Sequence, residues 1–244
     1  MYSIIDFEVT LRCNGACKDC LRFCGYPQDL GLDYSNSDLT EQQVMDFICQ
    51  VKDLGLRRGK PVISLLIVSG GEPLLHPNIK EIVNSLREEL VKPGFIQYDI
   101  LVNSNFCVPI PEELKPFVLN YSLPKDNVRI HRSVFTHPDD LGCPRPNFKD
   151  CNYTGKPKLV FSSSGFNVCC VADGLIRLFD QSELFLKSLP DSYEDFPLGN
   201  MNSVCQHCVF GTAKIVSGQE VGNRISSIFL ERIQINKTRK QKVL

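Results

Sequence analysis

The chain has 244 residues, of which 43% are hydrophobic and 23% charged, which is enough apolar sequence to bury one large domain. Its formal net charge of −1 excludes a general polyanion binder, and the sequence holds no run of about 18 apolar residues that would cross a membrane. The first residues lack the charged-then-apolar order of a signal peptide, so we expect a soluble cytoplasmic protein with no membrane or nucleic-acid partner.

Apolar periodicity predicts the elements in chain order. The alternation at 3–11 predicts a strand, and Thr40 is predicted to cap a helix, with Gln43 completing a capping box. Further strands are predicted at 62–68, 97–103, 117–122 and 128–135, and a helix at 77–90. Strands that alternate with helices predict an α/β fold with a parallel sheet, open or closed into a barrel.

The character of the chain changes after about residue 136, where Cys, Pro, Gly and Asn become common. The apolar runs 158–161 and 166–168 flank a Ser-Ser-Ser-Gly turn and predict a β-hairpin, and 225–235 predicts one more helix or strand. We therefore predict a core domain at 1–140, followed at 141–244 by a small cysteine-rich domain, with a hairpin and a helix, and the C-terminal tail.

Twelve cysteines are many for a chain of this size. A cytosolic protein keeps its thiols reduced, so clustered cysteines indicate a metal site rather than disulfides. Cys49 is the exception, since it lies on the apolar side of the predicted first helix and is expected to be a buried small hydrophobe.

The first cluster is Cys13, Cys17 and Cys20 in a C-x3-C-x2-C pattern, directly after the first predicted strand. Thiolates are the usual ligands of iron–sulfur clusters, and a cubane takes four. Three cysteines on one loop therefore leave one iron open to a small molecule. A zinc knuckle with Cys24 as its fourth ligand is the alternative.

A second motif, Ser69-Gly70-Gly71-Glu72-Pro73, follows the apolar strand predicted at 62–68. Its glycines let the backbone approach a ligand closely, and the carboxylate of Glu72 can accept hydrogen bonds from an ammonium group. Taken alone, these residues are equally typical of an ordinary turn between a strand and a helix.

Together, the cysteines at 13–20 and the turn at 70–73 resemble the radical S-adenosylmethionine (SAM) superfamily, over roughly residues 5–135. The resemblance implies a partial (β/α)6 TIM-like barrel. It implies that Cys13, Cys17 and Cys20 hold a [4Fe–4S] cluster whose fourth iron chelates SAM. It also implies that the methionine end of SAM is contacted by Gly70, Gly71, Glu72 and Pro73. Reductive cleavage of SAM would then give a 5′-deoxyadenosyl radical that abstracts hydrogen from a substrate.

Weaker matches extend the resemblance. Ser104 and Asn105 end the next predicted strand and Ser122 the one after it, at positions that contact the SAM ribose in the family. Many members carry an aromatic residue before the third cysteine to pack on the adenine, but this chain has Asp19 there. Phe23 is the candidate to replace it.

A second constellation consists of Cys151, Cys170, Cys205 and Cys208. With Gly165, the first two match the Cys…Gly-x4-Cys opening of SPASM/twitch regions, which hold an auxiliary [4Fe–4S] cluster in radical SAM enzymes. Cys143 can replace Cys151 and Cys169 can replace Cys170 as a ligand. A structural zinc site is the alternative, and His207 is expected to be a spectator.

The resemblance implies an oxidoreductase, reduced by a flavodoxin or ferredoxin, in which the auxiliary cluster accepts an electron from the substrate radical. No segment resembling a leader-peptide recognition domain precedes the first strand, which favours a small hydroxylated substrate such as a sugar or cyclitol. Arg129 and His131 alternate on one face of the strand predicted at 128–135 and are the candidate catalytic residues. A peptide- or protein-modifying radical SAM enzyme and a non-catalytic zinc or iron–sulfur protein are the alternatives.

Overall fold

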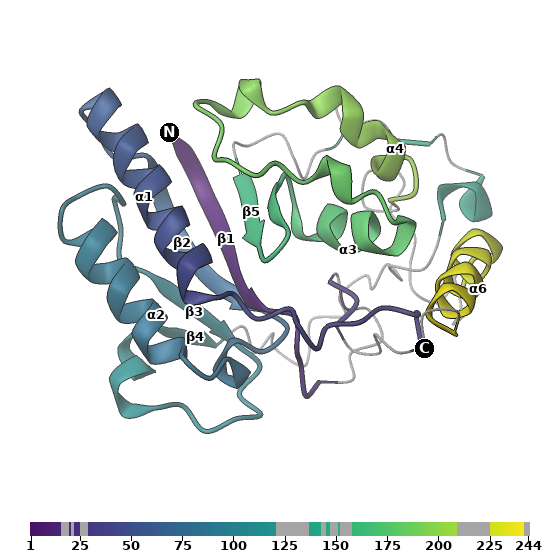
Figure 1. Ribbon diagram of the computed structural model, residues 1–244, viewed down its shortest axis with the longest axis horizontal. Helices are drawn as coiled ribbons and strands as arrows, with labels where there is room; N and C mark the ends of the chain where they lie inside the picture. Colours follow the sequence, from purple (N-terminus) through teal and green to yellow (C-terminus); the bar gives the residue numbers. More distant parts are fainter. Residues whose placement is uncertain are drawn as a thin grey trace.

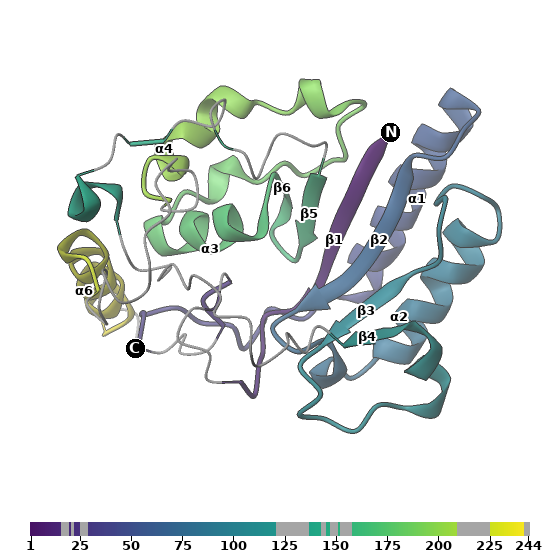
Figure 2. The ribbon, with the colours of Figure 1, turned by 180° about the vertical axis from the view of Figure 1, so that it is seen from behind.

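The computed structural model describes residues 1–15, 20, 22–24, 29–120, 137–142, 145–146, 151, 158–208 and 225–241. The strands are β1 (Tyr2–Thr10), β2 (Ile63–Gly70), β3 (Leu101–Ser104), β4 (Val118–Asn120), β5 (Lys158–Ser162) and β6 (Gly165–Asn167). They form one sheet in the order β4-β3-β2-β1-β5-β6 (Figures 1 and 2). The helices are α1 (Glu41–Arg58), α2 (Ile79–Leu86), α3 (Cys170–Phe179), α4 (Asn202–Cys205) and α6 (Ser227–Gln241).

The sheet is mixed and places β1 at its centre. β1 pairs in parallel with β2 on one side and with β5 on the other, whereas β6 runs antiparallel to β5. The predicted α/β class is therefore confirmed. Within the described residues the sheet is open, so the partial (β/α)6 barrel is not confirmed, and the strand predicted at 128–135 falls outside the residues described.

Local sequence signals account for the ends of α1. The Thr40 side chain accepts a hydrogen bond from the backbone of Gln43, whose side chain in turn accepts one from the backbone of Thr40, as predicted. Gly59, in the left-handed region at φ 60°, ends the helix. Cys49 is exposed, contrary to prediction. Successive residues of an α-helix are rotated by about 100° around its axis, so Cys49 points away from the side on which Ile48 is buried.

Aromatic side chains fix α1 against the centre of the sheet. The Phe7 ring of β1 lies 4.8 Å from the Phe47 ring of α1 and 5.3 Å from the Phe161 ring of β5. Phe166 of β6 joins this group, with its ring centroid 4.7 Å from that of Phe161. Such ring pairs add roughly 0.5–1.5 kcal/mol each beyond their burial. The apolar side chains of β1 therefore face α1.

The opposite face of the sheet, here called the inner face, carries the residues that alternate with this apolar set. On β1 these are Asp6 and Glu8, and on β2 their paired neighbours are Ile67 and Ser69. Ile67 is partly exposed, whereas its neighbour Leu66, on the face toward the helices, is fully buried. At Asp6 and Ile67 the inner face is thus the more open side of the sheet, whereas Glu8 and Ser69 are buried.

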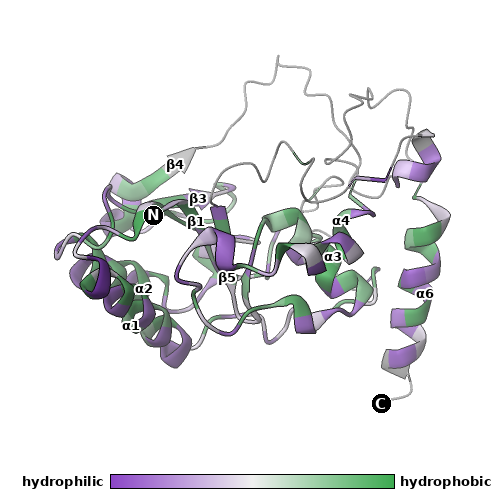
Figure 3. Cartoon of the chain, turned by 90° about the horizontal axis from the view of Figure 1, so that it is seen from above, coloured by the Kyte–Doolittle hydropathy of each residue, from purple (hydrophilic) through white to green (hydrophobic). Residues whose placement is uncertain are grey.

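The C-terminal residues continue the same structure. The predicted hairpin is confirmed as β5 and β6, and it extends the main sheet through the pairing of β5 with β1. The domain boundary near residue 140 remains a prediction. The tail is a helix, α6, which lies at the end of the molecule opposite α1 and α2 (Figures 1 and 3). Arg232 and Asn236 of α6 donate to the carbonyl of Leu178, which closes the C-terminal end of α3.

In the part of the chain that is described, no helix has the length and apolarity to cross a membrane.

Candidate functional site

The carboxyl ends of β1, β2 and β3 meet at one edge of the sheet, and two of the predicted motifs follow these ends directly (Figure 1). The first cysteine follows β1, and the Gly-Gly-Glu-Pro turn begins on the last residue of β2. Parallel strands bring their carboxyl ends together, and α/β proteins build their sites at that edge.

Backbone contacts hold the turn against the end of β1. The amide of Gly71 donates to the carbonyl of Thr10 and that of Glu72 to the carbonyl of Arg12, both at 2.8 Å. A Cβ atom on Gly71 would lie 2.2 Å from the Arg12 carbonyl oxygen, and one on Gly70 would lie 2.0 Å from that of Thr10. The glycines are therefore required by this close approach, which places the turn beside the residue before Cys13.

Glu72 is fully buried, and protein groups already use both of its carboxylate oxygens. Oε1 accepts from the amide of Leu74 and from the hydroxyl of Ser104, both at 3.0 Å. Oε2 accepts from the amide of Asn105 at 2.6 Å. Glu72 thus joins the turn to the end of β3, and the ammonium group expected from sequence would have to share Oε2 with Asn105.

Replacing Glu72 with glutamine is expected to lower the free energy of unfolding by about 1–3 kcal/mol, because the new NH2 group would face an amide or hydroxyl donor. Urea unfolding of the variant beside the wild type measures this loss. Glu113→Gln is the matched control, since that carboxylate is exposed and pairs with Lys80 at the surface. Unchanged stability in Glu72→Gln would contradict this role.

Asn105 ties β3 to the first cysteine. Its Nδ2 donates to the Asn14 side chain at 2.9 Å and approaches the Sγ of Cys13 at 3.8 Å. The amide of Gly15 also donates to that sulfur, at 3.3 Å. The sequence-predicted residues Cys13, Glu72, Ser104 and Asn105 are thus brought together. Cys17, Ser122, Arg129, His131 and Cys143 lie outside the described residues.

Cys20 and Cys24 share a hydrogen-bonded turn. The amide of Cys24 donates to the Sγ of Cys20 at 3.3 Å, and a hydrogen bond from the Cys24 side chain, more than this amide, lowers the pKa of Cys20 to about 6. The side-chain hydrogen bond with Cys20, followed by burial, raises the pKa of the Cys24 thiol. Cys20 is therefore the thiolate of the two near neutral pH, as a metal ligand must be.

Phe23 does not take the place expected from sequence. Its side chain is 2% exposed and packs in the core, and its backbone is in the left-handed region at φ 58°. A ring buried in this way offers no surface for an adenine. The turn thus points the residue after Arg22 into the protein rather than toward a ligand.

The second group of cysteines also gathers in space. Burial, together with the smaller effects of the charges of Cys208 and Cys151, raises the pKa of Cys205 to about 12. Burial likewise raises the pKa of Cys169, followed by the charges of neighbouring Cys170 and of Cys208 and, more weakly, Cys205. Cys169 therefore lies within electrostatic reach of the C-x2-C pair.

Cys170, the ligand expected from sequence, lies in a different environment. It is 8% exposed, belongs to the hydrophobic core, and its charge acts on Arg22 near the first cysteine loop. Cys169, Cys205 and Cys208 are only partly buried. The charges of the C-x2-C pair act on Cys169, which makes Cys169 a candidate partner of that pair beside Cys170.

His207 has a structural contact that sequence reasoning missed. Its ring stacks on Phe179 at 4.2 Å between centroids, and its Nδ1 lies 2.9 Å from the Nε2 of His137. Burial lowers the pKa of His207 to about 4, so the ring is neutral and joins the C-x2-C turn to the segment at 137–142. The spacing from His137 to His207 gives no signal in sequence.

The donor atoms agree in part with metal binding. Cys13 and Cys20 are partly buried thiols that accept backbone amide hydrogen bonds, a feature of iron–sulfur sites. Among the described residues, which exclude Cys17, no group of three or more His, Cys, Asp or Glu side chains is arranged to hold a metal ion. The donor chemistry therefore fits a cluster at the first site, without fixing its geometry.

Comparison with known proteins adds no relative to these observations. A scan against protein-family models and a search of curated proteins each found no match to the chain.

Proposed function

We propose that this chain is a radical SAM enzyme. The observation that carries the proposal is the meeting of three distant segments at one edge of the sheet. The turn at 70–73 binds the backbone next to Cys13, and Asn105 contacts both that cysteine and Glu72. The parallel run of β1, β2, β3 and β4 supports the proposed partial (β/α)6 barrel.

In this proposal Cys13, Cys17 and Cys20 hold a [4Fe–4S] cluster, and the turn at 70–73 holds SAM. When bound, the cluster supplies one electron to the SAM sulfonium, which yields methionine and a 5′-deoxyadenosyl radical. The protein stabilises the thiolates through the amides of Gly15 and Cys24, which donate to the two described sulfurs.

The inner face of the sheet next to this edge is the proposed substrate surface. It offers partly exposed apolar and polar side chains, among them Ile67, Leu101 and Asn103. We propose that the substrate is a small hydroxylated molecule, such as a sugar or cyclitol, which loses a hydrogen atom, a proton and one electron to become a carbonyl compound. Arg129 and His131 remain the proposed contacts to it.

A second site is proposed to take up the electron. Cys151, Cys205 and Cys208 supply three thiolates for an auxiliary [4Fe–4S] cluster, and their mutual electrostatic contacts support this grouping. The contacts of Cys169 favour it as the fourth ligand.

The test is anaerobic reconstitution followed by two assays. About eight iron and eight sulfide per chain are expected for two cubanes, with formation of 5′-deoxyadenosine from SAM under dithionite. About four of each would remove the auxiliary cluster from the proposal. Bound zinc without iron, and no cleavage of SAM, would overturn the proposal and favour a zinc protein.

A further inference from the structure

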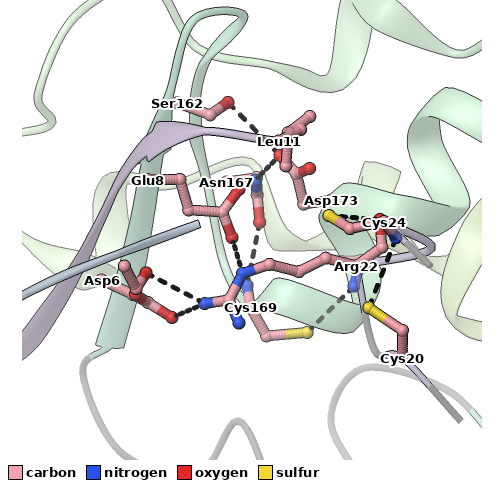
Figure 4. A network of polar contacts seen from close by, with 12 residues as sticks. Asp6, Glu8, Leu11, Cys20, Arg22, Cys24, Ser162, Asn167, Cys169 and Asp173 are labelled. Atoms are coloured by element: carbon pink, nitrogen blue, oxygen red, sulfur yellow. Dashed lines mark hydrogen bonds and ion pairs between the residues drawn. The ribbon is translucent and has the colours of Figure 1, made fainter. Parts of the chain in front are cut away.

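Arg22 lies two residues after Cys20, and its side chain leaves the loop to enter the inner face of the sheet (Figure 4). Its Nε donates to the Glu8 carboxylate and one terminal nitrogen donates to that of Asp6. The same nitrogen donates to the hydroxyl of Ser69 at 3.2 Å. One side chain thus joins the cysteine loop to both central strands.

This contact is mostly shielded from water, which sets its strength. The side chain of Arg22 is 14% exposed, that of Asp6 22% and that of Glu8 0%. Ser69 also donates to Asp6, so this acceptor of the guanidinium is itself held in place. Exposed ion pairs contribute little, whereas removing one partner of a buried and hydrogen-bonded pair leaves a charge unpaired.

Backbone hydrogen bonds connect Arg22, whose side chain is held in this way, to Cys20. The carbonyl of Arg22 accepts from the hydroxyl of Tyr34 at 3.3 Å and from the thiol of Cys24. The amide of Phe23 donates to the carbonyl of Cys20 at 3.0 Å, and that of Cys24 donates to its sulfur. The strained φ of Phe23 needs surrounding contacts to hold it, and the hydrogen bonds of the adjacent Arg22 are among them.

We propose that Arg22 is a positioning residue for the first cysteine site: its fork of hydrogen bonds to Asp6, Glu8 and Ser69 fixes the turn that presents Cys20 to a metal cluster. The inference rests on the proposed function for the identity of the cluster. The anchoring itself concerns only residues of this chain.

Arg22→Lys is the decisive variant, because the proposal requires a side chain that donates from two different nitrogen atoms. Lysine keeps the positive charge but offers a single ammonium group, which cannot reproduce the separate contacts of Nε and the terminal nitrogen. Arg177→Lys is the matched control. Arg177 is equally shielded, at 15% exposed, and pairs with buried Asp173, but its described hydrogen bonds go to Asp173 and Ser162 rather than to the loop.

The first measurement uses cluster-free protein and is independent of any cofactor. Alkylation of Cys20 by iodoacetamide is followed by mass spectrometry, with the exposed Cys49 as internal reference. Arg22→Lys should change the rate at Cys20 several-fold relative to Cys49, whereas Arg177→Lys should leave that ratio as in the wild type. Equal ratios in all three proteins would overturn the inference.

The second measurement uses reconstituted protein that lacks the second site through Cys205→Ala and Cys208→Ala. The EPR signal of the reduced cluster, and its change on adding SAM, should differ in Arg22→Lys and match the wild type in Arg177→Lys. Unchanged spectra would overturn the inference while leaving the proposed function intact. A wild type that binds no iron would instead overturn the proposed function, and the alkylation ratios would still decide the role of Arg22. Should Arg22→Lys fail to fold, Ser69→Ala removes one contact of the same fork and takes its place.

Discussion

Replacing Cys20 with alanine is expected to remove about four of the eight iron atoms per reconstituted chain and to abolish the formation of 5′-deoxyadenosine. The reason is the position of this thiol. Cys20 is partly buried and accepts an amide hydrogen bond from Cys24, and its pKa of about 6 keeps it ionised at neutral pH. Iron and sulfide analysis, with chromatography of the SAM products, checks the result.

The control for this variant is Cys49→Ala, because Cys49 is an exposed thiol on α1, remote in sequence from both cysteine groups. It should keep the full iron content and the full rate of SAM cleavage. Retention of both properties in Cys20→Ala would contradict the proposed site, and so would equal losses in the two variants. Cys24→Ala separates the alternatives further, since a zinc knuckle would lose its fourth ligand whereas the proposed cluster would keep its three.

Much of the fold could be predicted because its signals are local. The capping box of Thr40 and Gln43, the apolar run of β2 and the Ser-Ser-Ser-Gly turn each depend on residues close together in the chain. The pairing of β5 with β1 could not be predicted in this way. It joins residues more than a hundred positions apart, and it depends on packing such as that of Phe7 on Phe161.

The candidate site likewise combines features that the sequence predicts with features that it does not. Spacing alone predicted the cysteine motif and the glycine turn, but the role of Glu72 as a buried link to Ser104 required coordinates. The inner-face carboxylates did leave a signal in the sequence. Asp6 and Glu8 occupy alternating positions in a largely apolar strand, and a buried strand tolerates such charges only with a partner, here Arg22.

The fourth ligand of the proposed auxiliary cluster is a choice between two adjacent cysteines at the start of α3. Cys169 is the N-cap of the helix, and its sulfur accepts from the amide of Ala172 at 3.3 Å. A helix N-terminus stabilises a thiolate, whereas burial and the charges of Cys208 and Cys205 raise the pKa of this sulfur; the effect of those charges shows that the C-x2-C pair is near. Cys170 is instead buried in the core, near Arg22.

Cys169→Ala is therefore expected to lose about four iron atoms per chain together with the EPR signal of the second cluster, while SAM cleavage by the first site persists. Cys170→Ala should keep its iron and lose roughly 1 kcal/mol of stability from the cavity left in the core. Iron analysis, EPR and urea unfolding of the two variants side by side measure these effects. Loss of iron in Cys170→Ala alone would show that the fourth ligand is Cys170, the cysteine that the Gly-x4-Cys spacing from Gly165 predicts. Full iron content in both variants would show that neither cysteine at the start of α3 is a ligand of the second site.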